Sequence, residues 1–135
     1  MIDHLSLGVA DLARAGAFYD AVLATLGHAR VWTADDAIGY GPPGGDDRLA
    51  LWARPGAEPL PRPGFHLALT APDPAAVRAF FAAALQHGGR DDGPPGLRPR
   101  YGPGYYAAFV LDPDGHRLEA VHHGVVPGAP EAGEG

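Results

Sequence analysis

The sequence predicts an α+β fold built from two copies of a βαβββ unit. The first observation is an internal repeat, in which residues 4–27 align without a gap on residues 66–89. Ten of these 24 pairs are identical, and most of the identities are not alanines, so chance explains the match poorly. The second observation is that each copy switches from a strand period of two residues to a helical period of 3.6 residues.

Each copy reads as a strand, a turn and a helix. In the first copy, leucine and valine alternate with small or polar residues over residues 4–9, and an amphipathic pattern follows. Asp11 stands where a helix N-cap is expected, and Gly27 stands where the helix would end. In the second copy, Asp73 takes the N-cap place and Pro74 the first helical position, where a missing N–H costs nothing.

Shorter apolar runs follow each helix and predict the remaining strands. We expect one domain, with module one at about residues 2–53, a proline-rich linker at about 54–64, module two at about 65–123 and a flexible tail at 124–135. The segment 91–104 is rich in proline and glycine and predicts one poorly defined strand and a loop. The other predicted strands are 29–33, 37–40 and 48–53 in module one, and 105–111 and 116–122 around the turn Asp112-Pro113-Asp114-Gly115 in module two.

Composition excludes several classes of function. The chain has 135 residues, a net charge of −6 and no basic stripe, so we expect no nucleic-acid partner. It contains no cysteine and no lysine, which excludes thiolate chemistry and lysine Schiff bases. No apolar run approaches the roughly 20 residues of a membrane span, and no signal peptide is evident, so we expect a cytoplasmic protein without a membrane partner.

Three side chains of metal-binding type share one predicted face. His4 and His66 occupy equivalent places in the repeat, on the strand face that points away from the helices. On the last strand, Leu118 and Ala120 fit the helix-facing phase, which leaves Glu119 with the histidines. Two histidines and one carboxylate that converge on a cup would suit divalent Fe, Mn, Ni or Zn. A single strand histidine is more often a hydrogen-bonded or surface residue, but the matched pair favours a metal site.

The remaining histidines are assigned less specifically. His28, His87 and His116 fall at helix ends or turns and are expected at the surface. His122 and His123 are adjacent and must face opposite sides of a strand. His123 therefore either approaches the rim of the cup or belongs to a frayed strand end.

Several motifs carry a resemblance to a known family. Residues 4–12 (HLSLGVADL) with 17–19 (AFY), and the run 109–119 with its Asp-Pro-Asp-Gly turn and Glu119, resemble the vicinal-oxygen-chelate superfamily. That superfamily includes glyoxalase I, fosfomycin-resistance transferases, bleomycin-resistance proteins and extradiol dioxygenases. The stretch 96–106 is similar to a glyoxalase-like bacterial subgroup. The resemblance implies a half-open mixed β-barrel, a homodimer, and His4, His66 and Glu119 as ligands of a divalent metal.

One departure from the family narrows the activity. Glyoxalase I has a second glutamate ligand on the last strand of its first module. When the last strands of the two modules are aligned here, Ala50 takes the place in module one that Glu119 has in module two, and residues 48–53 contain no carboxylate. We therefore expect a metal-dependent enzyme for a small substrate with vicinal oxygens, either a lyase, a dioxygenase or a transferase, rather than a true glyoxalase I. The alternative is a metal-free protein that sequesters a drug-like ligand. The further candidate residues are Tyr105 and Tyr106 beside Glu119 in catalysis, and Ser6, Trp52, Tyr101 and Arg100 in substrate binding.

Overall fold

A computed structural model describes residues 1–56 and 64–124, and its elements follow one order twice. The predicted α+β fold with paired βαβββ modules is confirmed. Module one contains β1 (Leu5–Val9), α1 (Leu12–Ala24), β2 (Ala29–Thr33), β3 (Ala37–Gly41) and β4 (Leu49–Ala53). Module two contains β5 (Leu67–Thr70), α2 (Pro74–Gln86), β6 (Arg90–Leu97), a 3-10 turn η1 (Pro99–Tyr101), β7 (Tyr106–Leu111) and β8 (Arg117–His122).

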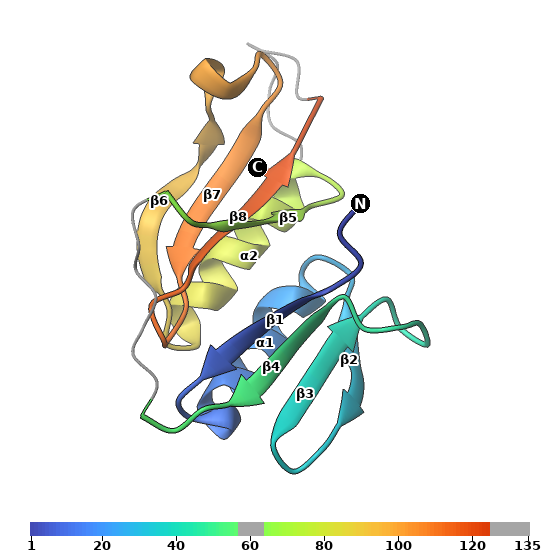
Figure 1. Ribbon diagram of the computed structural model, residues 1–135. Helices are drawn as coiled ribbons and strands as arrows, with labels where there is room; N and C mark the ends of the chain where they lie inside the picture. Colours follow the sequence, from blue (N-terminus) through green and yellow to red (C-terminus); the bar gives the residue numbers. More distant parts are fainter. Residues whose placement is uncertain (57–63, 125–135) are drawn as a thin grey trace.

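Each module forms its own mixed sheet. The strand orders β1-β4-β3-β2 and β5-β8-β7-β6 are equivalent, and in each sheet the first strand of the module pairs in parallel with the last. The helices α1 and α2 pack against each other, which joins the two modules (Figure 1). No hydrogen-bonded strand pair links the two sheets within the described residues, which is consistent with a half-open barrel.

Both helices begin at the predicted caps. The side chain of Asp11 accepts a hydrogen bond from the backbone N–H of Arg14, and Asp73 accepts one from Ala76. Such caps satisfy backbone donors that have no partner inside the helix. The chain leaves α1 through Gly27, whose φ of +89° is a conformation that glycine adopts without strain.

The alternation in β1 decides which face meets the helices. Leu7 and Val9 are buried against α1, whereas Ser6 and Gly8 are exposed on the other face. The buried apolar side chains of both modules form one continuous core, with Phe18 of α1 and Phe80 of α2 among its fully buried members. The helices thus occupy one face of each sheet and leave the opposite face open for a site.

A buried hydrogen-bond network also ties the β7–β8 turn to α1. Asp112 accepts from the hydroxyl of Tyr19 at 2.6 Å and bonds the ring of His116 at 2.7 Å. In the same turn, Asp114 accepts from the backbone N–H of Ala10 at 2.9 Å. The expectation that His116 is a surface residue was wrong, because the turn folds back onto module one and leaves His116 only 3% exposed.

The proline-rich part of module two is more ordered than predicted. It forms β6, which pairs with β7 in a register that shifts on both sides of Gly93, and then the turn η1. Most of the predicted linker (57–63 of about 54–64) and of the predicted tail (125–135 of 124–135) lies outside the described residues. Within residues 1–56 and 64–124, no helix is long and apolar enough to cross a membrane.

Candidate functional site

The antiparallel pairing of β7 with β8 fixes the position of Glu119. Its neighbours Leu118 and Ala120 belong to the core beneath the sheet, so the Glu119 side chain projects from the opposite, open face. Phe109 of β7 lies directly across from it. Glu119 is only 1% exposed, and a carboxylate buried to this degree requires polar partners.

Two side chains supply those partners. Nε2 of His66, just before β5, lies 2.8 Å from one carboxylate oxygen of Glu119, and the hydroxyl of Tyr105 donates a hydrogen bond to the other. Burial and the hydrogen bond to Glu119 raise the pKa of Tyr105 to about 12, so the phenol remains a donor at neutral pH. The His66 side chain is 47% exposed, which leaves one side of this cluster open to a ligand.

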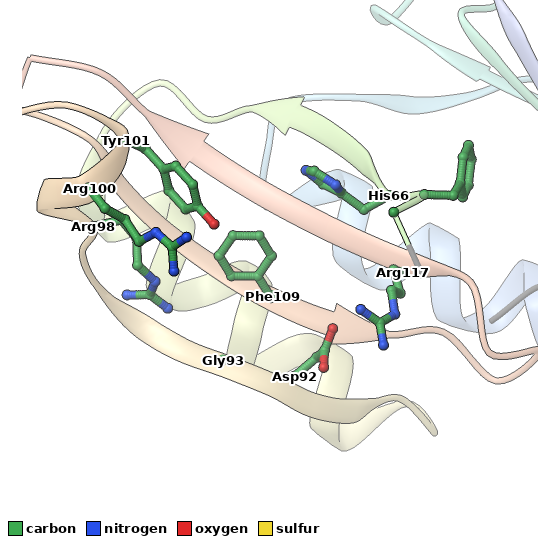
Figure 2. A pocket seen from close by; sticks show the side chains of 10 residues that line it. His66, Asp92, Gly93, Arg98, Arg100, Tyr101, Phe109 and Arg117 are labelled. Carbon is green, nitrogen blue, oxygen red and sulfur yellow. The ribbon is translucent and has the colours of Figure 1, made fainter. Parts of the chain in front are cut away.

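The cluster borders two cavities that share lining residues. The inner cavity has a volume of about 200 Å³ and contains Glu119 and Tyr105. The outer cavity has a volume of about 450 Å³, within the usual range for small-molecule sites. Figure 2 shows His66, Tyr101 and Phe109 in the lining of the outer cavity. The same three side chains also line the inner cavity, which contains Glu119.

Other predicted site residues lie on module one and do not join this cluster. His4 precedes β1, is exposed, and bonds the carboxylate of Asp3 at 2.7 Å. Ser6 is exposed on β1, and Trp52 of β4 packs edge-on against Trp32. The predicted site residues therefore lie in two places. Those of module two come together around Glu119, and those of module one lie apart from them.

The adjacent residues Tyr105 and Tyr106, at the start of β7, face opposite sides of the sheet. Tyr105 points to Glu119, whereas Tyr106 is 1% exposed and belongs to the core, where its hydroxyl accepts a hydrogen bond from Arg78 at 3.4 Å. The structure does not bring Tyr106 to the site, because successive strand residues face opposite sides of a sheet. Tyr101 and Arg100 both line the outer cavity, and their role in substrate binding stays a prediction.

Strand register supports the equivalence between Ala50 and Glu119. Ser6 pairs with Ala50 in the first sheet, and Ala68 pairs with Glu119 in the second. Because Ser6 and Ala68 occupy equivalent places in the repeat, Ala50 holds the place of Glu119 in module one. Module one therefore offers no carboxylate at this position.

Sequence reasoning missed several residues of the site. Phe109 and Arg117 both line the outer cavity. Arg117 stands two places before Glu119 on β8 and therefore shares its sheet face, a signal that the strand period already contained. His123 was left open, and the structure packs its ring edge-on against Tyr105, with 5.1 Å between the ring centroids.

The sequence matches the model of a known protein family. That model describes the glyoxalase/bleomycin resistance protein/dioxygenase superfamily and matches residues 1–120 of the chain. The protein belongs to this superfamily. The predicted resemblance is thereby confirmed at the level of the family. Among curated protein sequences, none matches the chain.

Solved structures of the superfamily share the fold over most of their length. A glyoxalase/bleomycin resistance protein from Albidiferax ferrireducens is 31% identical, with a TM-score of 0.75 over 90% of this chain and 98% of that one. A glyoxalase-related enzyme from Fulvimarina pelagi is 26% identical, with a TM-score of 0.66 over 87% and 85%. Fosfomycin resistance protein FosX from Mesorhizobium loti, 20% identical with a TM-score of 0.66 over 92% of both chains, shows a similar fold only.

The described residues of one chain supply only part of the donor set expected for a superfamily metal site. His66 and Glu119 offer an imidazole nitrogen and a buried carboxylate within 2.8 Å of each other, which is suitable chemistry for a divalent ion. The described residues contain no group of three or more His, Cys, Asp or Glu side chains close enough to hold a metal. A third protein ligand would therefore have to approach from outside this cluster.

Proposed function

We propose that the protein is a divalent-metal-dependent enzyme that acts on a small substrate with vicinal oxygens. The observation that carries the proposal is the cluster of His66, Glu119 and Tyr105, in which a buried carboxylate faces a cavity. Such a carboxylate has no arginine or lysine partner among the described residues, so a cation would offset its charge. Membership of the superfamily supports the proposal, and the cluster lies on the face of the sheet that the helices leave open.

We infer that the third ligand is His4 of a second copy of the chain. His4 and His66 hold equivalent positions in two equivalent modules, and His4 is exposed beside an edge strand. A twofold dimer that places the open face of module one over the open face of module two of the other copy would bring His4 to His66 and Glu119. The same arrangement would add Ser6 and Trp52 to the wall of the cavity.

Each residue of the cluster then has a distinct task. The metal ion, when bound, supplies a Lewis acid that polarises oxygens of the substrate. His66 and Glu119 would hold the ion, as a neutral and an anionic ligand. Tyr105 orients the Glu119 carboxylate through its hydrogen bond and remains protonated, as its raised pKa requires. A partner of this kind fixes the geometry of a ligand and tunes its affinity for the metal.

The metal part of the proposal is tested by thermal unfolding. Protein freed of metal is melted with and without Mn²⁺, Ni²⁺, Zn²⁺ or anaerobic Fe²⁺, and at least one ion should raise the melting temperature of the wild type. The variants His4→Ala, His66→Ala and Glu119→Ala should lose most of that shift. His87→Ala removes an exposed histidine at the end of α2 and should retain it. A wild type that responds to none of the four ions would contradict the proposal.

The shared site is tested by mixing two defective variants. His4→Ala and Glu119→Ala are co-expressed with different tags, and the mixed dimers are purified. If the ligands come from different copies, each mixed dimer contains one intact site and one site that lacks two ligands. Metal binding should then recover to about half of the wild-type stoichiometry. If His4 and Glu119 of the same chain formed the site, no mixed dimer could bind metal normally.

One observation favours a second candidate function. Both oxygens of Glu119 already have hydrogen-bond partners in a single chain, so the cavity could persist as a metal-free binding site. A protein that sequesters a drug-like molecule would use it in this way. Such a protein would bind its ligand equally well after metal removal, and Glu119→Gln would leave its affinity nearly unchanged. A metal-dependent enzyme would lose activity in both cases.

A further inference from the structure

We propose that the substrate is a small organic acid, whose carboxylate, phosphate or phosphonate group is held by arginines of the outer cavity. This inference rests on the proposed function for the reacting part of the substrate, but the anion site itself does not require a metal. Three of the ten arginines of the chain, Arg98, Arg100 and Arg117, line this one cavity. Figure 2 shows Arg98 and Arg100 at one end of it and Arg117 at the other, with the Phe109 ring between them.

Two of the three guanidinium groups, those of Arg100 and Arg117, have no hydrogen-bond partner in the described structure. None of the three forms an ion pair with a carboxylate in the described part of the chain. Arg117 is the clearest case, because its Nε is buried and has no hydrogen-bond partner there. A buried donor without an acceptor is unfavourable, so the guanidinium of Arg117 is poorly satisfied by the protein itself. Its terminal nitrogens also have no hydrogen-bond partner in the described structure and are the ones available to a ligand oxygen in the cavity.

Arg98 and Arg100 differ in how firmly they are held. Arg98 donates to the carbonyls of Pro94 and Gly96, and its guanidinium carbon lies 5.4 Å from the centre of the Phe109 ring. Arg100 contacts only the face of Tyr101, at 5.3 Å, and makes no hydrogen bond in the described structure. Arg98 therefore contributes a fixed positive charge, while Arg100 has its donors free to bind an acid group.

The charge of the cavity is opposite to that of the chain. Its described lining carries three arginines and a single carboxylate, Asp92, whereas the chain as a whole has a net charge of −6. Arginine binds carboxylate and phosphate oxygens through paired, charge-assisted hydrogen bonds. An excess of positive charge inside a concave, partly apolar site therefore selects anions from a mixture of small molecules.

The path from the arginines to Glu119 explains why the anion belongs to a substrate. Arg117 and Glu119 lie two places apart on the same face of β8, and the outer cavity shares three side chains with the inner one. Because Arg117 lies at the other end of the cavity from Arg98 and Arg100, a molecule with its acid group at one end would extend its remaining oxygens toward His66 and Glu119. Phe65 and Tyr101, which are 41% and 55% exposed at the cavity, offer apolar contact for the body of such a molecule.

The test measures anion binding by metal-free protein. Wild-type protein, stripped of metal and dialysed free of chelator in a phosphate-free buffer, is titrated with malonate, with methylphosphonate and with neutral malonamide, while the arginine Nε–Hε resonances are followed by NMR. The two acids should bind and shift the Arg117 resonance, and malonamide should not. The acid that binds more tightly identifies the class, carboxylate or phosphonate.

Variants decide whether the arginines hold the anion. The double variant Arg100→Gln/Arg117→Gln should weaken binding of the preferred acid at least about tenfold, which corresponds to losing one strong contact. Arg117→Lys keeps the positive charge at this partly buried position and is therefore less prone to misfold than Arg117→Gln. It should bind the preferred acid more weakly than the wild type does. Arg90→Gln removes the same charge from the same module outside the cavity lining and should leave affinity unchanged.

Two outcomes would overturn the inference. One is a wild type that binds neither acid, and the other is a double variant that binds them as well as the wild type does. Because these measurements use metal-free protein, they are independent of the metal titrations. A protein that binds acids but no metal would refute the proposed metal-dependent enzyme and support the anion site. A protein that binds metal but neither acid would refute the anion site and leave the proposed enzyme standing.

Discussion

At the scale of single residues, the site depends on how the buried carboxylate of Glu119 is partnered. The strand period predicted that His66 and Glu119 share a face, and the structure places them 2.8 Å apart. The same period placed His4 on an equivalent face but contains no information on the distance between two faces. That distance depends on how modules or copies pack, which is why one chain alone does not assemble the predicted triad.

The hydroxyl of Tyr105 should matter for metal affinity, whereas that of Tyr106 should not. Tyr105→Phe removes the hydrogen bond that orients Glu119, so we expect metal affinity to fall by about 10- to 100-fold, as for other partners of metal ligands. Tyr106→Phe is the matched control, because this side chain lies in the core beneath the sheet. Isothermal titration of both variants with the activating ion checks the difference. Equal metal affinities of the two variants would show that the Tyr105 hydroxyl does not contribute to metal binding.

The alanine at position 50 leads to an expected absence of activity. Its register places it where a second carboxylate would stand in module one, so no such group is available there to move the substrate proton. We expect isomerisation of the methylglyoxal–glutathione adduct to be absent or much slower than about 1 per second, the low end of ordinary turnover. Turnover at ordinary enzyme rates with any of the four metals would show that another residue acts as the base.

At the scale of secondary-structure elements, local signals placed the strands and helices well. Strand β2 (Ala29–Thr33) has the predicted bounds, and both helices start at the predicted aspartate caps. Strand β6 was poorly defined in advance, because prolines and glycines at 93–96 hide the strand period. The burial of His116 was not predictable from local sequence, since it depends on Asp112, which bonds a tyrosine 93 residues away.

The His116–Asp112 pair should make stability depend on pH. Burial alone would lower the pKa of His116, but the hydrogen bond and charge of Asp112, with Asp114 nearby, outweigh it and raise that pKa above 6.5. A raised histidine pKa stabilises the fold fully below the unfolded value of 6.5 and loses this contribution as pH rises through the folded value. The hydrogen bond involves a charged group, so about 1.5–3 kcal/mol is at stake.

The comparison of wild type with His116→Gln measures this contribution. The difference in their free energies of unfolding should be largest near pH 5.5 and should shrink toward pH 8, as followed by urea denaturation at each pH. His87→Gln, at the exposed end of α2, serves as the control for the substitution itself. A difference that does not change with pH would mean that the pKa of His116 is the same in the folded and the unfolded protein.

At the scale of the whole molecule, the division of predicted ligands between two modules argues for a dimer. His4, Ser6 and Trp52 belong to module one, while His66, Glu119 and the arginine-lined cavity belong to module two. The edge strands β1 and β5 have no strand partner on their outer sides within the described residues, and open edges of this kind favour association. We therefore expect light scattering to give the mass of a homodimer at micromolar concentration.

Metal binding and dimerisation should then be coupled. An ion held by His66 and Glu119 of one copy and by His4 of the other binds the dimer more tightly than the monomer. By linkage, added metal must lower the dimer dissociation constant by the same factor by which dimerisation raises metal affinity.

Sedimentation of dilute wild-type protein should show more dimer with the activating ion than without it. His4→Ala should dimerise normally without metal but gain nothing from it, because its substitution leaves the other interface contacts in place. A metal effect that survives in His4→Ala would place the third ligand elsewhere, and a wild type that remains monomeric with saturating metal would refute the shared site.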